Sequence, residues 1–223
     1  MLVKMPRSLC YCYYSIGLST GTLRQRSVTG MGSSQSADGG NVKELKVVVV
    51  GMPNAGAKSL VARWTTDAWL EKPEKNDPGW QPLMRPFDKT QLHLLAVGST
   101  VGLWQEHIST ADVLVFVVDG SDEFDEAAFS ESFNKAAFAL KEGAPVVILV
   151  NKVDADPDDD SKEAAMRVAD SPGSAVQAKC SAAVASCAVS QSVRQCKALL
   201  SSAKSGFGCE EAIRAICGVR LVF

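Results

Sequence analysis

A glycine-punctuated segment that follows a run of valines is the part of this sequence best suited to chemistry. Residues 46–50 read KVVVV, an apolar run typical of a strand buried on both faces of a parallel sheet. The next segment, Gly51 to Ser59 (GMPNAGAKS), can form a loop that leads into a helix. Backbone N–H groups of such a loop, together with the N-terminus of the helix, bind phosphate. The segment therefore predicts a phosphate-binding loop.

This loop departs by one residue from the usual pattern, G-x-x-x-x-G-K-[ST]. Gly51 and Gly56 have the expected spacing, but Ala57 stands between Gly56 and Lys58. Either one residue is inserted before the lysine, or the ungapped register holds and Ala57 occupies the lysine position. The sequence leaves both alternatives open, and they differ in the positive charge offered to a phosphate.

A second polar cluster, Asn151-Lys152-Val153-Asp154, follows directly on the apolar run PVVILV. Its asparagine can tie neighbouring loops together, and the stem of its lysine can cover one face of a planar base. Its aspartate can accept two N–H bonds from guanine, a pair of donors that adenine lacks. Further along, Ser202-Ala203-Lys204 can place a backbone N–H against guanine O6. The two clusters together predict a guanine-binding site.

Alternating strands and helices are predicted to position these loops. The pattern indicates an α/β fold, a P-loop three-layer fold with a mostly parallel central sheet and helices on both faces, whose ligands bind at the carboxyl ends of the strands. Prolines at 73, 78, 82 and 86 argue against regular structure over 71–87. After the first strand, we expect strands at 91–97, 112–120, 145–150 and 197–201 and helices at 58–70, 122–141, 158–169 and 208–216.

The domain organisation predicted from composition has three parts. Residues 1–42 form a flexible N-terminal extension, residues 43–218 the folded domain, and residues 219–223 a short C-terminal tail. Within the domain, residues 171–195 consist mostly of Ala, Ser, Val and Cys. We interpret that stretch as a low-complexity insertion.

The first thirty residues leave the cellular location open. They contain no acidic residue, which is typical of mitochondrial targeting, whereas a disordered extension or a downstream start are the alternatives. Met31-Gly32 opens a match to the N-myristoylation pattern that applies only if Met31 is the initiator. A myristoyl chain on Gly32 would give reversible membrane association. We expect a cytoplasmic protein, peripheral on membranes in that case.

The net charge and the pattern of cysteines argue against several classes of protein. A net charge of -2 argues against nucleic acid as a partner, because phosphate neutralisation needs a basic surface. The seven cysteines show no repeated C-x-x-C pairs, so we expect reduced thiols rather than a disulfide or zinc framework. No apolar run approaches the ~20 residues that a membrane-spanning helix needs.

With these motifs in place, residues 44–217 resemble the small GTPases, and within them the ADP-ribosylation-factor-like (Arf-like) group. Asn54-Ala55-Gly56 repeats the N-A-G of that group's phosphate loop, and VFVVDGSD matches its central strand and turn. Leu103-Trp104 matches the L-W after its second switch, and Asp77-Pro78-Gly79-Trp80 stands where the group has T-[IV]-G-F.

The resemblance implies GTP or GDP as the ligand, with Mg²⁺, and protein partners that are effectors or exchange factors contacting residues 77–110. It implies Ser59 as a metal ligand. It implies that the guanine base is bound by Asn151, Lys152, Asp154, Ser202, Ala203 and Lys204, and the phosphates by Gly51, Asn54, Ala55, Gly56, Lys58 and Ser59.

The departures from the family pattern fall on the phosphate side of the site. Where the family has D-x-G-G and a following glutamine, this chain has Ala96-Val97-Gly98-Ser99 and Thr100, and Asp77 replaces the threonine of the first switch. These positions support Mg²⁺, the γ-phosphate and the attacking water, so we assign no catalytic residue. We expect a guanine-nucleotide-dependent switch, in membrane trafficking by analogy, with weak or absent hydrolysis. The alternative is a pseudo-GTPase scaffold without turnover.

Overall fold

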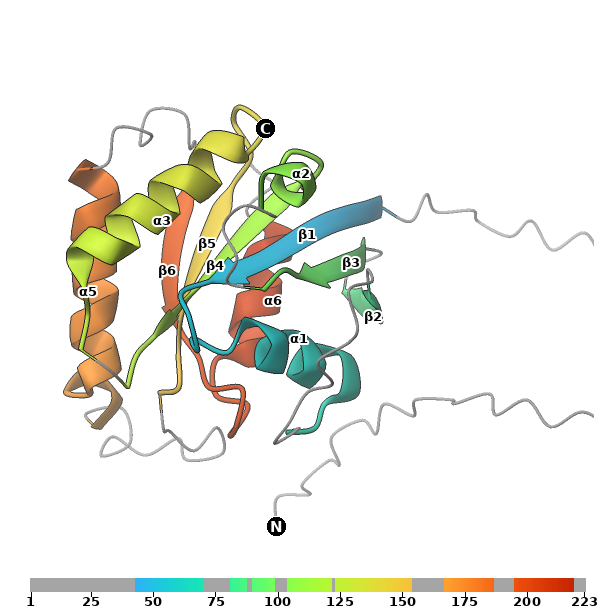
Figure 1. Ribbon diagram of the computed structural model, residues 1–223. Coiled ribbons are helices and arrows are strands. Elements are labelled where there is room, and N and C mark those ends of the chain that lie inside the picture. The colour runs from blue at the N-terminus through green and yellow to red at the C-terminus, as the bar shows by residue number, and fades with distance from the viewer. Residues whose placement is uncertain are drawn as a thin grey trace, which may run out of the picture. The chain divides into compact units, whose positions relative to one another are not determined.

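A central sheet covered by helices on both faces organises the chain in a computed structural model (Figure 1). The structure describes residues 43–69, 81–87, 90–98, 104–121, 123–153, 167–186 and 195–218, with the backbone alone for 81–87.

Six strands form the sheet in the order β2-β3-β1-β4-β5-β6. Five of them run parallel, and β2 pairs antiparallel with β3 at one edge. Their bounds are β1 Lys43–Gly51, β2 Gln81–Phe87, β3 Thr90–Ala96, β4 Val113–Asp119, β5 Val146–Asn151 and β6 Cys196–Leu200.

The helices divide between the two faces of this sheet. On one face, α1 (Ala57–Thr66) and α6 (Cys209–Gly218) pack against one buried cluster. On the other face, α2 (Trp104–Ile108), α3 (Glu126–Ala139) and α5 (Pro172–Ser186) pack against a second cluster. The predicted three-layer α/β fold with a mostly parallel sheet is therefore confirmed.

Strand β1 contains four consecutive valines, without the alternation of polar and apolar residues that a half-exposed strand shows. Val48 and Val50 belong to the cluster under α3, and Val47 and Val49 to the cluster under α1. All four are 0% exposed, because successive side chains of a strand point to opposite faces and both faces are covered. The strand is thereby fixed at the centre of the sheet, and the loop that follows it is held at the carboxyl edge.

The prediction that residues 71–87 contain no regular structure is wrong for 81–87, which form β2. A central strand forms hydrogen bonds with a neighbouring strand on each side, and proline lacks the N–H that such a bond needs. β2 pairs with β3 alone and lies at the edge of the sheet, so one side of its backbone needs no partner within the sheet. Pro82 and Pro86 are tolerated for that reason. The helix predicted at 158–169 lies mostly outside the described residues.

Helix α5 lies inside the region expected to be an insertion. It buries Val176, Cys180 and Ala183 in the cluster that also receives α3, so this part of the region contributes to the core. Its small residues gave no contrast between a polar and an apolar face, which is why the sequence did not indicate a helix. Among the described helices, none combines the length and the apolar composition that spanning a bilayer requires.

The cysteine thiols differ in burial, so their reactivity can test how the helices pack on the two faces of the sheet. Burial raises the pKa of Cys180 to about 12 and that of Cys209 to about 11, whereas Cys196 is exposed. Because the thiolate is the reactive form, we predict that iodoacetamide at pH 8 alkylates Cys196 in the native protein well before Cys180 or Cys209. Peptide mass spectrometry measures each site.

The urea-unfolded protein is the control, in which the three cysteines should react at similar rates. Native alkylation of Cys180 as fast as that of Cys196 would contradict the packing of α5 on the sheet.

Candidate functional site

The phosphate loop connects β1 to α1 through two backbone conformations that favour small or amide residues. Asn54 has φ 62° and Gly56 has φ 91°, both in the left-handed region. A Cβ at Gly56 would lie 2.5 Å from Nδ2 of Asn151, so a side chain there would displace the asparagine. Gly51 is equally constrained, since its Cβ would lie 2.7 Å from the carbonyl oxygen of Val117.

The start of α1 favours one of the two registers of this loop. The helix begins at Ala57, immediately after Gly56, which fits the ungapped register. In that register Ala57 occupies the position that the pattern reserves for lysine, and Lys58 the position of the metal-binding hydroxyl. Lys58 follows Ala57 in the first helical turn and is exposed. That turn has no acidic residue and no side-chain cap, which leaves its N–H groups without a competing anion.

Asn151, at the end of β5, ties three distant segments together. Its Nδ2 donates to the carbonyl oxygen of Ala55 at 2.8 Å, and its Oδ1 accepts from the backbone N–H of Ala203 at 3.0 Å. The side chain is 2% exposed, so both bonds are shielded from water. One amide thus joins the phosphate loop, the end of β5 and the loop after β6.

Lys152, the next residue, is held against the end of β4. Its backbone is left-handed, with φ 66°, and its amine forms an ion pair with Oδ2 of Asp119. The other carboxylate oxygen accepts from the backbone N–H of Ser121 at 2.9 Å and from its hydroxyl at 2.7 Å. Burial raises the pKa of Asp119, but the hydrogen bonds from Lys152 and Ser121 outweigh it and lower the pKa below its usual value. Asp119 therefore stays ionised and orients the lysine.

The loop after β6 folds back on itself to expose one lysine. Ser202 donates its N–H to the carbonyl oxygen of Phe207 at 2.8 Å and accepts from the N–H of Gly206 at 2.8 Å. Ser202 and Ala203 are buried, whereas Lys204 is exposed. The N–H of Val153 donates to the carbonyl oxygen of Ser201 at 3.1 Å, so this loop and the segment after β5 are also joined through their backbones.

These segments surround one cavity of about 210 Å³. It lies where the guanine-binding and phosphate-binding predictions converge, so the structure brings the two predicted groups together. Gly51, Asn54, Ala55 and Lys58 do not line the cavity. Asp154, Asp77, Ser99 and Thr100 lie outside the described residues. The cavity is lined by Gly56, Ser59, Trp69, Ser121, Asn151, Lys152, Ser202, Ala203 and Lys204.

Trp69 and Ser121 were missed by the sequence reasoning. Trp69 lies beyond the end of α1 and is 41% exposed, which is unusual for an indole. The sequence feature that could have indicated Trp69 is its position, about one turn beyond the end of the helix that follows the phosphate loop. Ser121 follows Asp119 by two residues, and its signal was the short polar turn after a buried strand.

The lining of the cavity offers contacts for a planar base. A base there would meet the stem of Lys152, the indole of Trp69 and the loop around Ala203. For Mg²⁺, the described residues contain no group of three or more His, Cys, Asp or Glu side chains. Ser59 lies in the cavity wall, one residue beyond the hydroxyl position of the ungapped register, which Lys58 occupies. Its assignment as a metal ligand belongs to the other register and stays a prediction.

A model of a known protein family matches most of the chain. The model of the ADP-ribosylation factor family matches residues 32–203, more than half of the chain. The matched range contains the phosphate loop, Asn151, Lys152 and Ala203, so it includes all three segments that the asparagine joins.

The bridging role of Asn151 predicts a large loss of stability when it is replaced. In Asn151→Ala the carbonyl of Ala55 and the N–H of Ala203 lose their buried partner, which we expect to lower the free energy of unfolding by about 1–3 kcal/mol. Urea unfolding followed by far-UV circular dichroism measures the change.

Asn134→Ala is the matched control. Asn134 lies in α3, and its Oδ1 makes no hydrogen bond. Alanine also favours a helix more than asparagine does, so this change should leave stability equal or higher. Equal losses in the two variants would contradict the bridge.

Proposed function

The chain belongs to the ADP-ribosylation factor family of small GTP-binding proteins, and we propose that within this family it is a guanine-nucleotide-dependent switch with weak or absent intrinsic GTP hydrolysis. The convergence of Asn151, Lys152 and Ala203 on one cavity beside the phosphate loop is the observation that carries this proposal.

The base side of the site retains what recognition of guanine requires. Nδ2 and Oδ1 of Asn151 each make a hydrogen bond, and Lys152 is held by Asp119, so neither side chain has to reorganise when a base arrives. Preorganised partners lose less conformational entropy on binding. By family resemblance Asp154 would accept the N–H donors of guanine, and the N–H groups around Ala203 would face its O6.

The phosphate side has lost charged groups. Ala57 stands at the position of the lysine that neutralises phosphate charge, and Ala96, at the end of β3, stands where the family has an aspartate that supports Mg²⁺. Lys58 adds a positive charge to the first turn of α1, where the helix dipole is already positive. Such a lysine is favoured when an anion is bound nearby, so we propose that it partly offsets the alanine.

Partners and location follow from the family alone. We propose effector or exchange-factor contacts over residues 77–110 and a role in membrane trafficking from the cytoplasm, with reversible membrane association if Gly32 is acylated. A second candidate, a pseudo-GTPase scaffold that binds no nucleotide or binds it without turnover, is favoured by the alanines at 57 and 96.

Binding of nucleotide should raise the stability of the full chain. We expect 1 mM GTP or GDP with Mg²⁺ to raise the melting temperature by several degrees and ATP to leave it unchanged, because a ligand that binds only the native state stabilises it by mass action. Asp154→Asn should abolish the preference for guanine. Differential scanning fluorimetry measures these shifts.

A single-turnover assay with bound GTP then shows whether the protein hydrolyses it. An absence of any shift would favour the scaffold without nucleotide, and an equal shift with ATP would contradict guanine recognition.

Restoring the lysine of the phosphate loop should strengthen phosphate binding selectively. We expect Ala57→Lys to tighten GTP binding about 10- to 100-fold, since hydrogen bonds to charged groups contribute about 1.5–3 kcal/mol, and to leave GMP binding nearly unchanged. Isothermal titration calorimetry of both nucleotides measures the difference.

Ala57→Gln, which has a long side chain without charge, is the control and should have little effect on either nucleotide. A large loss of GTP binding in Lys58→Ala, with no gain in Ala57→Lys, would show that Lys58 already supplies the phosphate charge.

A further inference from the structure

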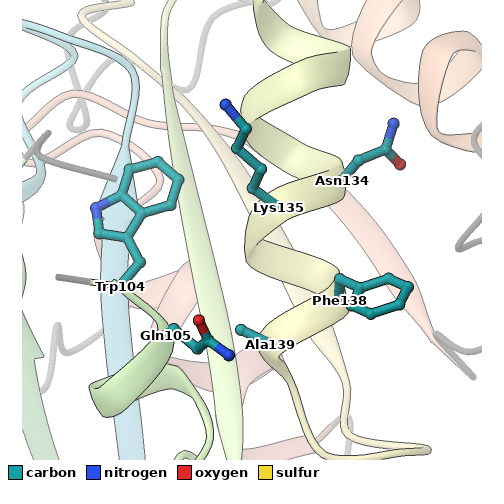
Figure 2. Close-up of a pocket in the computed structure, with 6 residues that line it drawn as sticks. All are labelled: Trp104, Gln105, Asn134, Lys135, Phe138 and Ala139. Carbon is teal, nitrogen blue, oxygen red and sulfur yellow. The ribbon is translucent and has the colours of Figure 1, made fainter. Parts of the chain in front are cut away.

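The nucleotide cavity has one wall formed by a loop, because residues 202–204, which line it, lie between β6 and α6. A hollow of about 480 Å³ between α2 and α3 is lined instead by side chains of the two helices, among them Trp104 from α2 and Lys135 from α3 (Figure 2). A helix keeps its shape through its own backbone hydrogen bonds. The position of a loop depends on the elements packed against it, so the contacts of residues 202–206 decide the shape of the nucleotide cavity on this side.

Within residues 202–206, all of which the structure describes, one backbone N–H is left for a ligand. The N–H of Ala203 already donates to the bridging asparagine. The N–H of Ser205 donates to the hydroxyl of Ser202 at 3.2 Å, and that of Gly206 donates to its carbonyl oxygen at 2.8 Å. Among the described residues, none accepts from the N–H of Lys204, a residue that lines the cavity. This N–H is therefore the donor of the loop that can serve a bound base.

Arg63, in the last turn of α1, packs against the tip of this loop. Its Nη2 donates to the carbonyl oxygen of Ser205 at 3.4 Å, which is long for a hydrogen bond. The guanidinium also lies close to Gly206, where a Cβ would come within 2.5 Å of Nη2, 3.2 Å of Cζ and 3.3 Å of Nε. The planar group therefore rests on backbone that only a glycine leaves open.

Helix α6 holds the same loop from its other end. The thiol of Cys209 donates to the carbonyl oxygen of Ser202 at 3.5 Å. Burial raises the pKa of Cys209 to about 11, and the positive charge of Arg63 opposes that rise, so the guanidinium lies near this thiol as well. Gly206, with φ 90°, gives the loop a backbone freedom that other residues lack. Contacts from α1 and α6 are what restrict it.

We propose that Arg63 is a positioning residue for guanine recognition, which holds this loop so that the N–H of Lys204 faces O6 of the base. Arg63 does not line the cavity, so it acts through Ser205 and Gly206. The proposal rests on the proposed function for its ligand. The contact between α1 and the loop does not, which allows the two to be tested separately.

Hydrogen exchange of the nucleotide-free full chain tests the contact itself. Arg63→Met keeps a long side chain and a similar helix propensity, so α1 should persist. We expect the amides of residues 203–207 to exchange at least about tenfold faster in this variant, because the loop opens locally more often, and those of β4 to keep their rates. Arg63→Lys restores a charged donor without the planar group and should give an intermediate rate. Mass spectrometry of peptic peptides measures both segments.

Binding of modified bases tests the consequence for recognition. In 6-thio-GDP a sulfur, which is a weak acceptor, replaces O6 and both N–H donors remain, whereas IDP keeps O6 and lacks the 2-amino donor. We expect the original chain to bind GDP about tenfold tighter than 6-thio-GDP, and Arg63→Met to reduce this preference about threefold. The preference over IDP, which reports on the donors that Asp154 would accept, should stay the same. Isothermal titration calorimetry measures both preferences, and Arg63→Lys should recover part of the first.

Arg214→Met is the matched control. Arg214 lies on α6, the helix that follows the loop, and forms an ion pair with Glu210 of the same helix. This variant should exchange at the rates of the original chain and keep both preferences.

Unchanged exchange of residues 203–207 in Arg63→Met would overturn the proposal. An equal fall in the preferences over 6-thio-GDP and IDP would also overturn it, because it would indicate a general loss of the site. If the original chain binds GDP and Arg63→Met keeps both preferences, the positioning role alone fails. If the original chain binds none of the three nucleotides, the proposed function fails, and faster exchange would then support only the contact between α1 and the loop.

Discussion

The two hydrogen bonds of the Asn151 side chain are the constraint on which the site depends. One bond goes to the carbonyl of Ala55, which lies 96 positions from Asn151 in the sequence. The other comes from the N–H of Ala203, which lies 52 positions from it. The amide is buried, so both bonds form in a low-dielectric interior, where leaving either one unmade is expensive. The conformation of Gly56 leaves room for this amide, and the parallel sheet brings the three loops to the same edge. The cavity exists because these requirements are met together.

Most of the scaffold could be predicted because its signals were strong and local. The valine run of β1 and the apolar runs of β4 and β5 gave their strands, and Asn151-Lys152 followed directly on one of them. Pro82 and Pro86 misled the prediction, because sequence alone does not reveal which strand lies at an edge. Helix α5 was not predicted because its small residues show no apolar face, and Trp69 was missed because it belongs to no known motif. The loop register needed the observed start of α1 at Ala57.

The site is unequal in its two halves. Asn151 and Lys152, on the side of the cavity where we expect the base, are held by hydrogen bonds and an ion pair. The hydrogen bonds from Lys152 and Ser121 outweigh the effect of burial, lower the pKa of Asp119 and keep it ionised at neutral pH. The phosphate loop has left-handed backbone at Asn54 and Gly56, but in the ungapped register alanine stands where the pattern has lysine. In a family whose turnover depends on phosphate charge, this division is the basis of our proposal that nucleotide binding is kept and hydrolysis is weak or absent.

Titration calorimetry of GMP, GDP and GTP against the full chain tests this account most directly. If binding energy comes mainly from the base, the three dissociation constants should agree within about tenfold, a difference of about 1.4 kcal/mol, and AMP should show no binding. A GMP affinity hundreds of times weaker than that of GTP, or an AMP affinity equal to that of GMP, would contradict it.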